Sequence, residues 1–179
     1  MILTAARAAF AARGFAGASV RGIAADAGVD PALVHHYFAN KDELFLATVQ
    51  VPVDLPQIID RVTADGLAGL GERVVATLLS IWDSELQAGL VAALRAALND
   101  PAMARSLSEF VTSEVLGRLM RPTQLSPAAT SDRLGLVGSQ LLGLIIGRYV
   151  LRLPALTDRP AAELVADIGP TVQRYLDGA

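Results

Sequence analysis

Apolar residues recur every three or four positions through the first 48 residues of the chain, which is the spacing of amphipathic helices. The first helix is predicted to begin near Leu3 and to end at Gly14, because glycine readily takes the left-handed conformation that closes many helices. A second helix with one buried stripe is predicted from Val20 to Ala27, and Gly28 ends it.

Polar residues at the expected starts of helices support these boundaries. Ser19, Asp30 and Asn40 each precede an apolar segment, and their side chains can accept a hydrogen bond from the first helical turn. Pro31 suits the first position of a third helix, where its missing N–H costs nothing. Glu43 can return a hydrogen bond to the start of a fourth helix in a capping-box arrangement.

Two prolines within residues 51–56 interrupt the helical pattern and predict a joint between two domains, 1–48 and 49–179. Beyond the joint, no useful stretch alternates as a strand does. The pattern instead predicts long helical segments, with a further turn considered at 84–89. These segments are 57–64, 70–98, 101–120, 127–153 and 160–176. The predicted fold class is therefore all-α.

Composition indicates a folded protein, since 53% of the residues are hydrophobic and 18% are charged. The absence of cysteine removes disulfides, thiolate metal sites and cysteine nucleophiles, and it favours a reducing cytoplasm. No secretion signal is recognised at the start, and no uncharged run reaches the roughly 20 apolar residues that a transmembrane helix needs. We therefore expect a soluble, cytoplasmic protein without a membrane partner.

Net charge gives no support for nucleic-acid binding, because the formal charge of the chain is −3. The first 48 residues carry equal numbers of basic and acidic side chains. They are Arg7, Arg13, Arg21 and Lys41 against Asp26, Asp30, Asp42 and Glu43. Evidence for DNA binding must therefore come from local pattern.

Two short predicted helices separated by Gly28 and Val29 are the parts of a helix-turn-helix. In that motif the second helix enters the major groove and its N-terminal residues reach the base edges. The outward positions of this helix are Pro31, Ala32, Leu33, His35 and His36.

Residues 19–45 read SVRGIAADAGVDPALVHHYFANKDELF, and this stretch resembles the DNA-binding signature of the TetR family nearly position by position. The resemblance covers about the first 48 residues. The remainder is similar only in its length and helical character. The resemblance implies a helix-turn-helix DNA-binding domain followed by a helical domain that binds an effector and dimerises, but it implies no particular ligand.

Site roles follow from the resemblance. Ser19, Tyr37 and Lys41 would contact DNA phosphates, and Arg21 would reach a phosphate or the groove edge. The five outward residues of the third helix, 31–33 and 35–36, would face the bases and specify sequence. The two adjacent histidines point in different directions on a helix, and the chain has no others, so no metal site is expected.

The C-terminal half is expected to hold the effector pocket and the dimer interface. Glycines inside the segment 127–153 each cost about 1 kcal/mol relative to alanine, and close approach of another helix would offset that cost. We assign Gly143, Leu144 and Gly147 to the interface, with tight packing inside one chain as the alternative. The candidate effector contacts are large or polar residues in apolar surroundings, for which ordinary core packing is the alternative. They are Trp82, Met103, Phe110, Met120, Gln140 and Tyr149.

The sequence thus predicts a dimeric regulator, a repressor by family default, that binds a palindromic operator in double-stranded DNA and is released by a small hydrophobic effector. No cofactor is expected. An enzyme is not expected either, because the chain lacks a glycine-rich phosphate loop and a nucleophile motif. The pair Glu109 and Glu114 would lie on different helix faces. The alternative is a helical ligand-binding protein of the same fold that has lost specific DNA binding.

Overall fold

The computed structural model describes residues 1–49, 53–121 and 127–178, and every regular element in these ranges is helical. The predicted all-α fold is confirmed. The chain forms two compact units. Unit 1 comprises Met1–Leu55 and Gly89–Glu114, and unit 2 comprises Pro56–Ala88 and Val115–Ala179. The predicted domain boundary after residue 48 stays a prediction.

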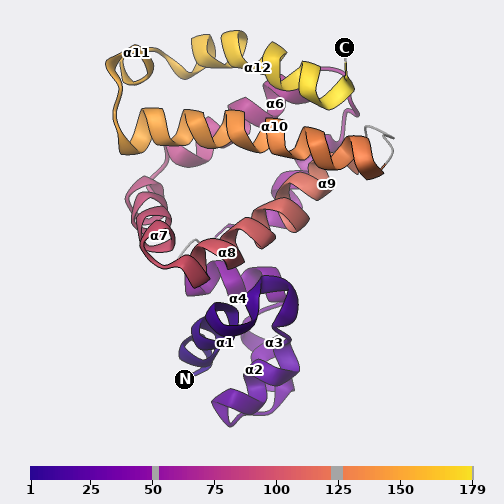
Figure 1. Ribbon diagram of the computed structural model, residues 1–179, viewed down its shortest axis with the longest axis vertical. Coiled ribbons are helices and arrows are strands. Elements are labelled where there is room, and N and C mark those ends of the chain that lie inside the picture. Colours follow the sequence, from indigo (N-terminus) through magenta and orange to yellow (C-terminus); the bar gives the residue numbers. More distant parts are fainter. Residues whose placement is uncertain (50–52, 122–126, 179) are drawn as a thin grey trace. The chain divides into compact units, whose positions relative to one another are not determined.

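Unit 1 is organised around its first helix, which packs against the second, the fourth and the eighth (Figure 1). Its helices are α1 (Ile2–Gly17), α2 (Val20–Ala27), α3 (Pro31–Tyr37), α4 (Lys41–Thr48), most of α7 (Gln87–Asn99), and α8 (Pro101–Phe110). Helix α8, remote in sequence from α1, therefore belongs to the same core as the N-terminal helices.

Four phenylalanines form the centre of unit 1. The ring centroid of Phe45 lies 5.1 Å from that of Phe10, 5.3 Å from that of Phe15 and 4.8 Å from that of Phe110. All four side chains are buried. The contacts of Phe45 with Phe10 and Phe15 are edge-to-face, and such contacts stabilise a core beyond the apolar area that they bury. The ring from α8 thus completes a core that α1 and α4 begin.

The predicted caps are confirmed. The N–H of Gly22 donates to Ser19 Oγ (3.1 Å), that of Ala32 to Asp30 Oδ1 (2.7 Å) and that of Glu43 to Asn40 Oδ1 (2.8 Å). The returning bond of the capping box differs by one residue, because Glu43 accepts from the N–H of Ala39 rather than from that of Asn40.

The predicted end of the first helix at Gly14 is confirmed in part. Gly14 takes a positive φ of 72° with a ψ of 172°, and this non-helical residue interrupts the helix at a kink. Helical structure resumes and continues to Gly17. Gly28, in contrast, is left-handed (φ 67°, ψ 31°) and ends α2 as predicted.

Unit 2 is built on α12, which packs along α6, while α10 packs against both (Figure 1). Its elements are α5 (Leu55–Thr63), α6 (Leu70–Trp82), α9 (Gly117–Leu119), α10 (Pro127–Ile145), the π-helix η3 (Ile146–Val150), α11 (Pro154–Thr157) and α12 (Ala161–Asp177). A second π-helix, η1 (Val111–Leu116), carries the chain from unit 1 into unit 2. The segment predicted over 70–98 is two helices, α6 and α7, with a turn between them.

Helices α6 and α12 approach at two glycines. A Cβ atom on Gly71 would lie 2.4 Å from the carbonyl oxygen of Gly169, and one on Gly169 would lie 2.6 Å from Glu72 Cγ. Gln173 fixes the crossing, because its Oε1 accepts from the N–H of Gly71 (2.9 Å) and its Nε2 donates to the carbonyl of Leu67 (3.0 Å). Only glycine permits this spacing.

Across the described ranges, no single helix has both the length and the apolar character to cross a membrane. Helices α6 and α7 meet that criterion only when they are taken together as a bent pair.

Candidate nucleic-acid interface

Helices α2 and α3 form a helix-turn-helix. Gly28 closes α2 in the left-handed conformation, and Asp30 and Pro31 open α3 two residues later. Helices α2 and α3 contact each other, and Ile23 of α2 and Val34 of α3 are buried. The remaining side chains of α3 therefore face away from the core. Local capping thus fixes both the turn and the presentation of the second helix.

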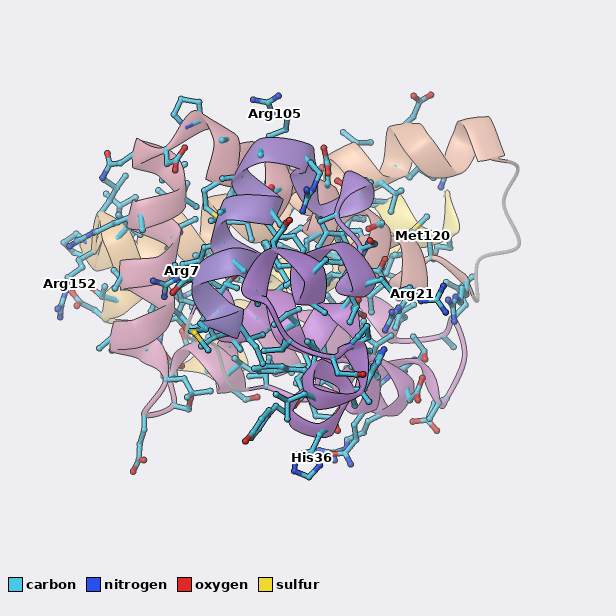
Figure 2. The ribbon with its side chains drawn as sticks, turned by 90° about the horizontal axis from the view of Figure 1, so that it is seen from below. Arg7, Arg21, His36, Arg105, Met120 and Arg152 are labelled. Atoms are coloured by element: carbon cyan, nitrogen blue, oxygen red, sulfur yellow. The ribbon has the colours of Figure 1, made fainter. Side chains whose placement is uncertain are left out.

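The predicted base-reading residues lie on this outer face. Ala32, Leu33, His35 and His36 are exposed, and Pro31 is half-buried. Leu33 is 41% exposed. Figure 2 shows the His36 side chain pointing away from the ribbon. The face offers imidazole hydrogen-bonding groups and an apolar side chain, the two kinds of group that read base edges in the major groove.

The predicted phosphate-contacting residues Ser19, Arg21 and Tyr37 are also exposed. Tyr37 is 61% exposed, and its ring lies 5.1 Å from that of His36 in an edge-to-face arrangement. Ser19 uses its oxygen to cap α2, and a hydroxyl group that accepts one hydrogen bond can still donate another. A side chain exposed to this extent is not part of the aromatic core of unit 1.

Lys41 has a role that the sequence did not signal. Its Nζ donates to the carbonyls of Phe15 (3.0 Å) and Ala18 (3.3 Å), and it lies 4.4 Å from the centre of the Phe15 ring. These carbonyls belong to the end of α1, where a positive charge is favourable. An ammonium group has three hydrogens, so one remains for a phosphate.

The other basic residues of the first 48 differ in their availability. Arg7 Nε donates to the carbonyl of Thr48 (2.9 Å), and Arg13 forms an ion pair with Asp26 (2.9 Å). Within residues 1–48, Arg21 is the one basic side chain that forms no hydrogen bond or ion pair with its own chain. It projects outward from α2 (Figure 2).

The candidate effector residues are divided between the two units. Met103 and Phe110 lie in unit 1, where Phe110 belongs to the aromatic core and Met103 is half-buried. Met120 and Gln140 lie in unit 2, the first buried and the second half-buried. For Phe110, core packing accounts for the side chain fully.

Trp82 and Tyr149, also in unit 2, are brought together. Their ring centroids are 5.3 Å apart, and both side chains are buried. The hydroxyl of Tyr149 donates to Asp83 Oδ1 (2.9 Å), and Arg148 Nη2 lies 3.4 Å from Asp83 Oδ2. Burial, followed by the hydrogen bond to Asp83, raises the pKa of Tyr149 to about 12. Sequence reasoning missed Asp83 and Arg148. The adjacency of Asp83 to Trp82 and of Arg148 to Tyr149 was the available signal.

A groove of about 610 Å³ lies on unit 1 along α1 and the end of α2. Alanines form most of its lining, and the ion pair of Arg13 and Asp26 lies at its edge. It contains none of the candidate effector residues.

The three residues assigned to the dimer interface have different surroundings. Gly143 is exposed, with open space where a Cβ would lie. Leu144 is buried inside unit 2, and Gly147 is buried with Leu156 Cδ1 2.6 Å from the position of a Cβ. The close approach at Gly147 therefore comes from the same chain. Leu142, beside Gly143 in the sequence, is 45% exposed.

The described residues contain no group of three histidine, aspartate or glutamate side chains arranged to hold a metal ion.

A capped helix pair that presents an exposed second helix, in a chain that is otherwise helical, defines a helix-turn-helix DNA-binding protein. Residues 2–48 match the family model described as bacterial regulatory proteins of the tetR family, and residues 68–176 match that of the tetracyclin repressor-like C-terminal domain. The chain belongs to the TetR family of transcriptional regulators. The family assignment made from the signature is thus confirmed, and the family is not enzymatic.

Solved and curated relatives agree with this assignment. The structure of a TetR-family regulator from Streptomyces coelicolor A3 is 34% identical, with a TM-score of 0.58, over 98% of this chain and 92% of that one. The HTH-type transcriptional regulators BetI of Brucella anthropi and Brucella canis are each 55% identical over 38 residues, or 21% of this chain. The chain matches only about a fifth of the length of these curated relatives, 20% and 19% respectively.

Proposed function

We propose that this TetR-family regulator is a cytoplasmic repressor that binds a palindromic DNA operator as a homodimer and is released by a small hydrophobic effector. The observation that carries the DNA-binding part is the outer face of α3. Leu33, His35, His36 and Tyr37 are exposed together on a helix whose N-terminus is capped by Asp30. None of these four side chains is buried in the described part of unit 1.

The proposed contacts with DNA fall into two groups, according to the chemistry of the side chains. The phosphates are contacted by Ser19, Arg21, Tyr37 and the third hydrogen of Lys41. These contacts fix the position of α3 along the DNA. The outer residues of α3 contact the base edges, with Leu33 suited to an apolar base substituent and the histidines to hydrogen-bonding groups. Phosphate contacts govern affinity for all sequences, and base contacts govern preference among them.

Dimerisation is proposed through the exposed face of α10. Leu136 and Leu142 are 47% and 45% exposed there, and Gly143 has open space above it. Leu136 and Gly143 are seven residues apart and share one face of α10, while Leu142 lies about 100° around the helix from Gly143. An exposed leucine beside a glycine that admits close approach suits a second helix. A dimer would place two α3 helices about 34 to 36 Å apart, the repeat of the major groove, which a palindromic site requires.

Effector binding is proposed for unit 2, around Trp82 and Tyr149. The paired rings are buried, so an effector would enter an apolar, aromatic site by opening their packing, and Asp83 and Arg148 provide polar groups beside that site. An effector that binds one conformation of the dimer more tightly than the other would change operator affinity by that difference. The chemistry of these side chains favours a hydrophobic or aromatic compound.

The test is selection of random duplex DNA by the purified protein, repeated with His35→Ala and Tyr37→Phe. We expect a palindromic site. His35→Ala should change the selected sequence, whereas Tyr37→Phe, which removes only the hydroxyl, should weaken binding to all sequences alike. Failure to select any site at low salt would reject the proposal.

That failure would favour a ligand-binding protein of the same fold without specific DNA binding. One observation supports this second candidate. Three of the four basic side chains of the first 48 residues, Arg7, Arg13 and Lys41, interact with their own chain, which lowers the positive potential available to DNA.

A further inference from the structure

The bend of α1 at Gly14 holds a carboxylate from α8. Glu109 Oε2 accepts a hydrogen bond from the N–H of Ala16 (3.0 Å), and a Cβ on Gly14 would lie 2.6 Å from that oxygen. The φ of 72° and ψ of 172° at Gly14 lie in a region open essentially to glycine alone. The conformation requires glycine at this position, and a Cβ atom would also displace the carboxylate of Glu109.

The bend explains why this amide needs an outside acceptor. In an unbroken helix the N–H of Ala16 would donate to the carbonyl of Ala12, four residues earlier. The non-helical backbone at Gly14 turns the chain away from that geometry. The carboxylate of Glu109 takes over as acceptor, and an ionised acceptor makes a hydrogen bond stronger than a neutral one does.

Two further contacts hold α8 in register with α1. Ser106 Oγ donates to the carbonyl of Phe10 (2.6 Å) within the core, and the Phe110 ring lies 5.1 Å from that of Phe15. Glu109 lies between Ser106 and Phe110 in the sequence. Helix α8 is thus fixed to α1 on both sides of Glu109 in the sequence, and this places the carboxylate of Glu109 at the bend.

The segment beyond the bend leads directly into the DNA-reading helices. Lys41 Nζ, from the start of α4, binds the carbonyls of Phe15 and Ala18. Ser19 follows at once and caps α2. Residues 15–19 are therefore held by Glu109 on an amide and by Lys41 on two carbonyls, and they set the direction in which α2 leaves α1.

We propose that Glu109 is a positioning residue for DNA reading: its carboxylate, bound to the Ala16 amide in the Gly14 bend, fixes residues 15–19 and so orients α2 and α3. This inference rests on the proposed function of α3. By this contact α8, which lies outside the DNA-binding motif, affects the affinity for the operator.

The experiment compares full-length Glu109→Ala and Glu109→Gln with the wild type. The control is Glu85→Gln, which removes an exposed carboxylate that no hydrogen bond or ion pair engages in the described chain. The measurements are backbone amide NMR spectra, exchange of the Ala16 amide hydrogen, and the Kd for the selected duplex at equal folded fraction.

Glu109→Ala should speed exchange at Ala16, shift resonances from residue 15 through α2 into α3, and raise Kd about tenfold on all sequences alike, since a hydrogen bond to a charged group is lost. Glu109→Gln keeps an acceptor oxygen and should restore most of the affinity. The control should leave all three measurements unchanged.

Unchanged exchange at Ala16, or resonance shifts that stop before Ser19, would overturn the inference. An unchanged Kd despite faster exchange would overturn it as well. A wild type that selects no duplex would reject the proposed function instead, and the spectra would still decide whether Glu109 orients α2 and α3.

Discussion

The hydroxyl group of Tyr149 donates a 2.9 Å hydrogen bond to the carboxylate of Asp83, across 66 residues of sequence, and joins η3 to the end of α6. Arg148 completes the group, since it binds both Asp83 and the carbonyl of Arg159. These contacts hold the ring of Tyr149 against that of Trp82.

The hydroxyl group of Tyr149 should lose its proton at a higher pH than that of an ordinary tyrosine. Its pKa is raised from 10.0 to about 12, so the protonated hydroxyl is favoured in the folded chain relative to the unfolded one. This contribution to stability is fully present below pH 10 and is lost as the pH rises toward 12. A spectrophotometric titration of tyrosinate should show one late group, which is absent from Tyr149→Phe.

The Tyr149→Phe variant should also lose roughly 1–2 kcal/mol of unfolding free energy in urea at pH 7, because the hydrogen bond to a charged acceptor is lost. Tyr37→Phe is the matched control, since Tyr37 is 61% exposed. Equal stability of the two variants would contradict this account of Asp83.

The crossing of α6 and α12 should not tolerate a methyl group. Gly71→Ala would place Cβ 2.4 Å from the carbonyl oxygen of Gly169 and 2.5 Å from the N atom of Gln173, both backbone atoms that cannot rotate away. We expect a loss of about 2–3 kcal/mol of unfolding free energy in urea. Gly17→Ala, where the added Cβ would meet only Arg13 Cβ at an ordinary 3.5 Å, is the control and should not lose stability. A neutral Gly71→Ala would show that the helices are not in such close contact.

Leu142→Glu should dissociate the proposed dimer without unfolding the chain. Leu142 is 45% exposed on α10, so a charge there costs little in one chain but is unfavourable in an apolar interface. Sedimentation velocity at micromolar concentration should show a dimer for the wild type and a monomer for the variant. Leu98→Glu, at a leucine 62% exposed on α7, should remain dimeric. A monomeric wild type would reject the dimer.

Arg21→Gln should lower the salt dependence of operator binding. Each phosphate neutralised by a basic side chain adds about 0.9 to the slope of log K against log salt concentration, and Arg21 is free to make such a contact. We expect the slope to fall by about one. Arg13→Gln, whose parent side chain is paired with Asp26, should leave the slope unchanged. Equal slopes for Arg21→Gln and the wild type would remove Arg21 from the interface.

Much of the helix-turn-helix could be predicted from sequence because its determinants are local. The caps at Ser19, Asp30 and Asn40 act within three residues, and the left-handed closure at Gly28 depends on the residue itself. Exposure of the outer face of α3 follows from burial of Val34 and the helical repeat. The family signature added the expected role of each position.

Contacts between distant segments could not be predicted. Gly14 looked like a helix end, but the carboxylate of Glu109, 93 residues from Ala16, occupies the bend that it forms. Gly147 was assigned to a dimer, but Leu156 of the same chain fills the space beside it. A glycine indicates close approach without indicating which segment approaches.

The sequence by itself determined where the helices of the DNA-binding motif begin, where α2 ends and which residues of α3 face outward, because capping and helical periodicity operate over a few residues. Only the tertiary structure decided which cations remain free and which aromatic rings meet. Lys41 is bound to the end of α1, and Phe110 joins the core of unit 1, because α4 and α8 pack against α1. Those contacts depend on segments brought together by folding, and no local pattern encodes them.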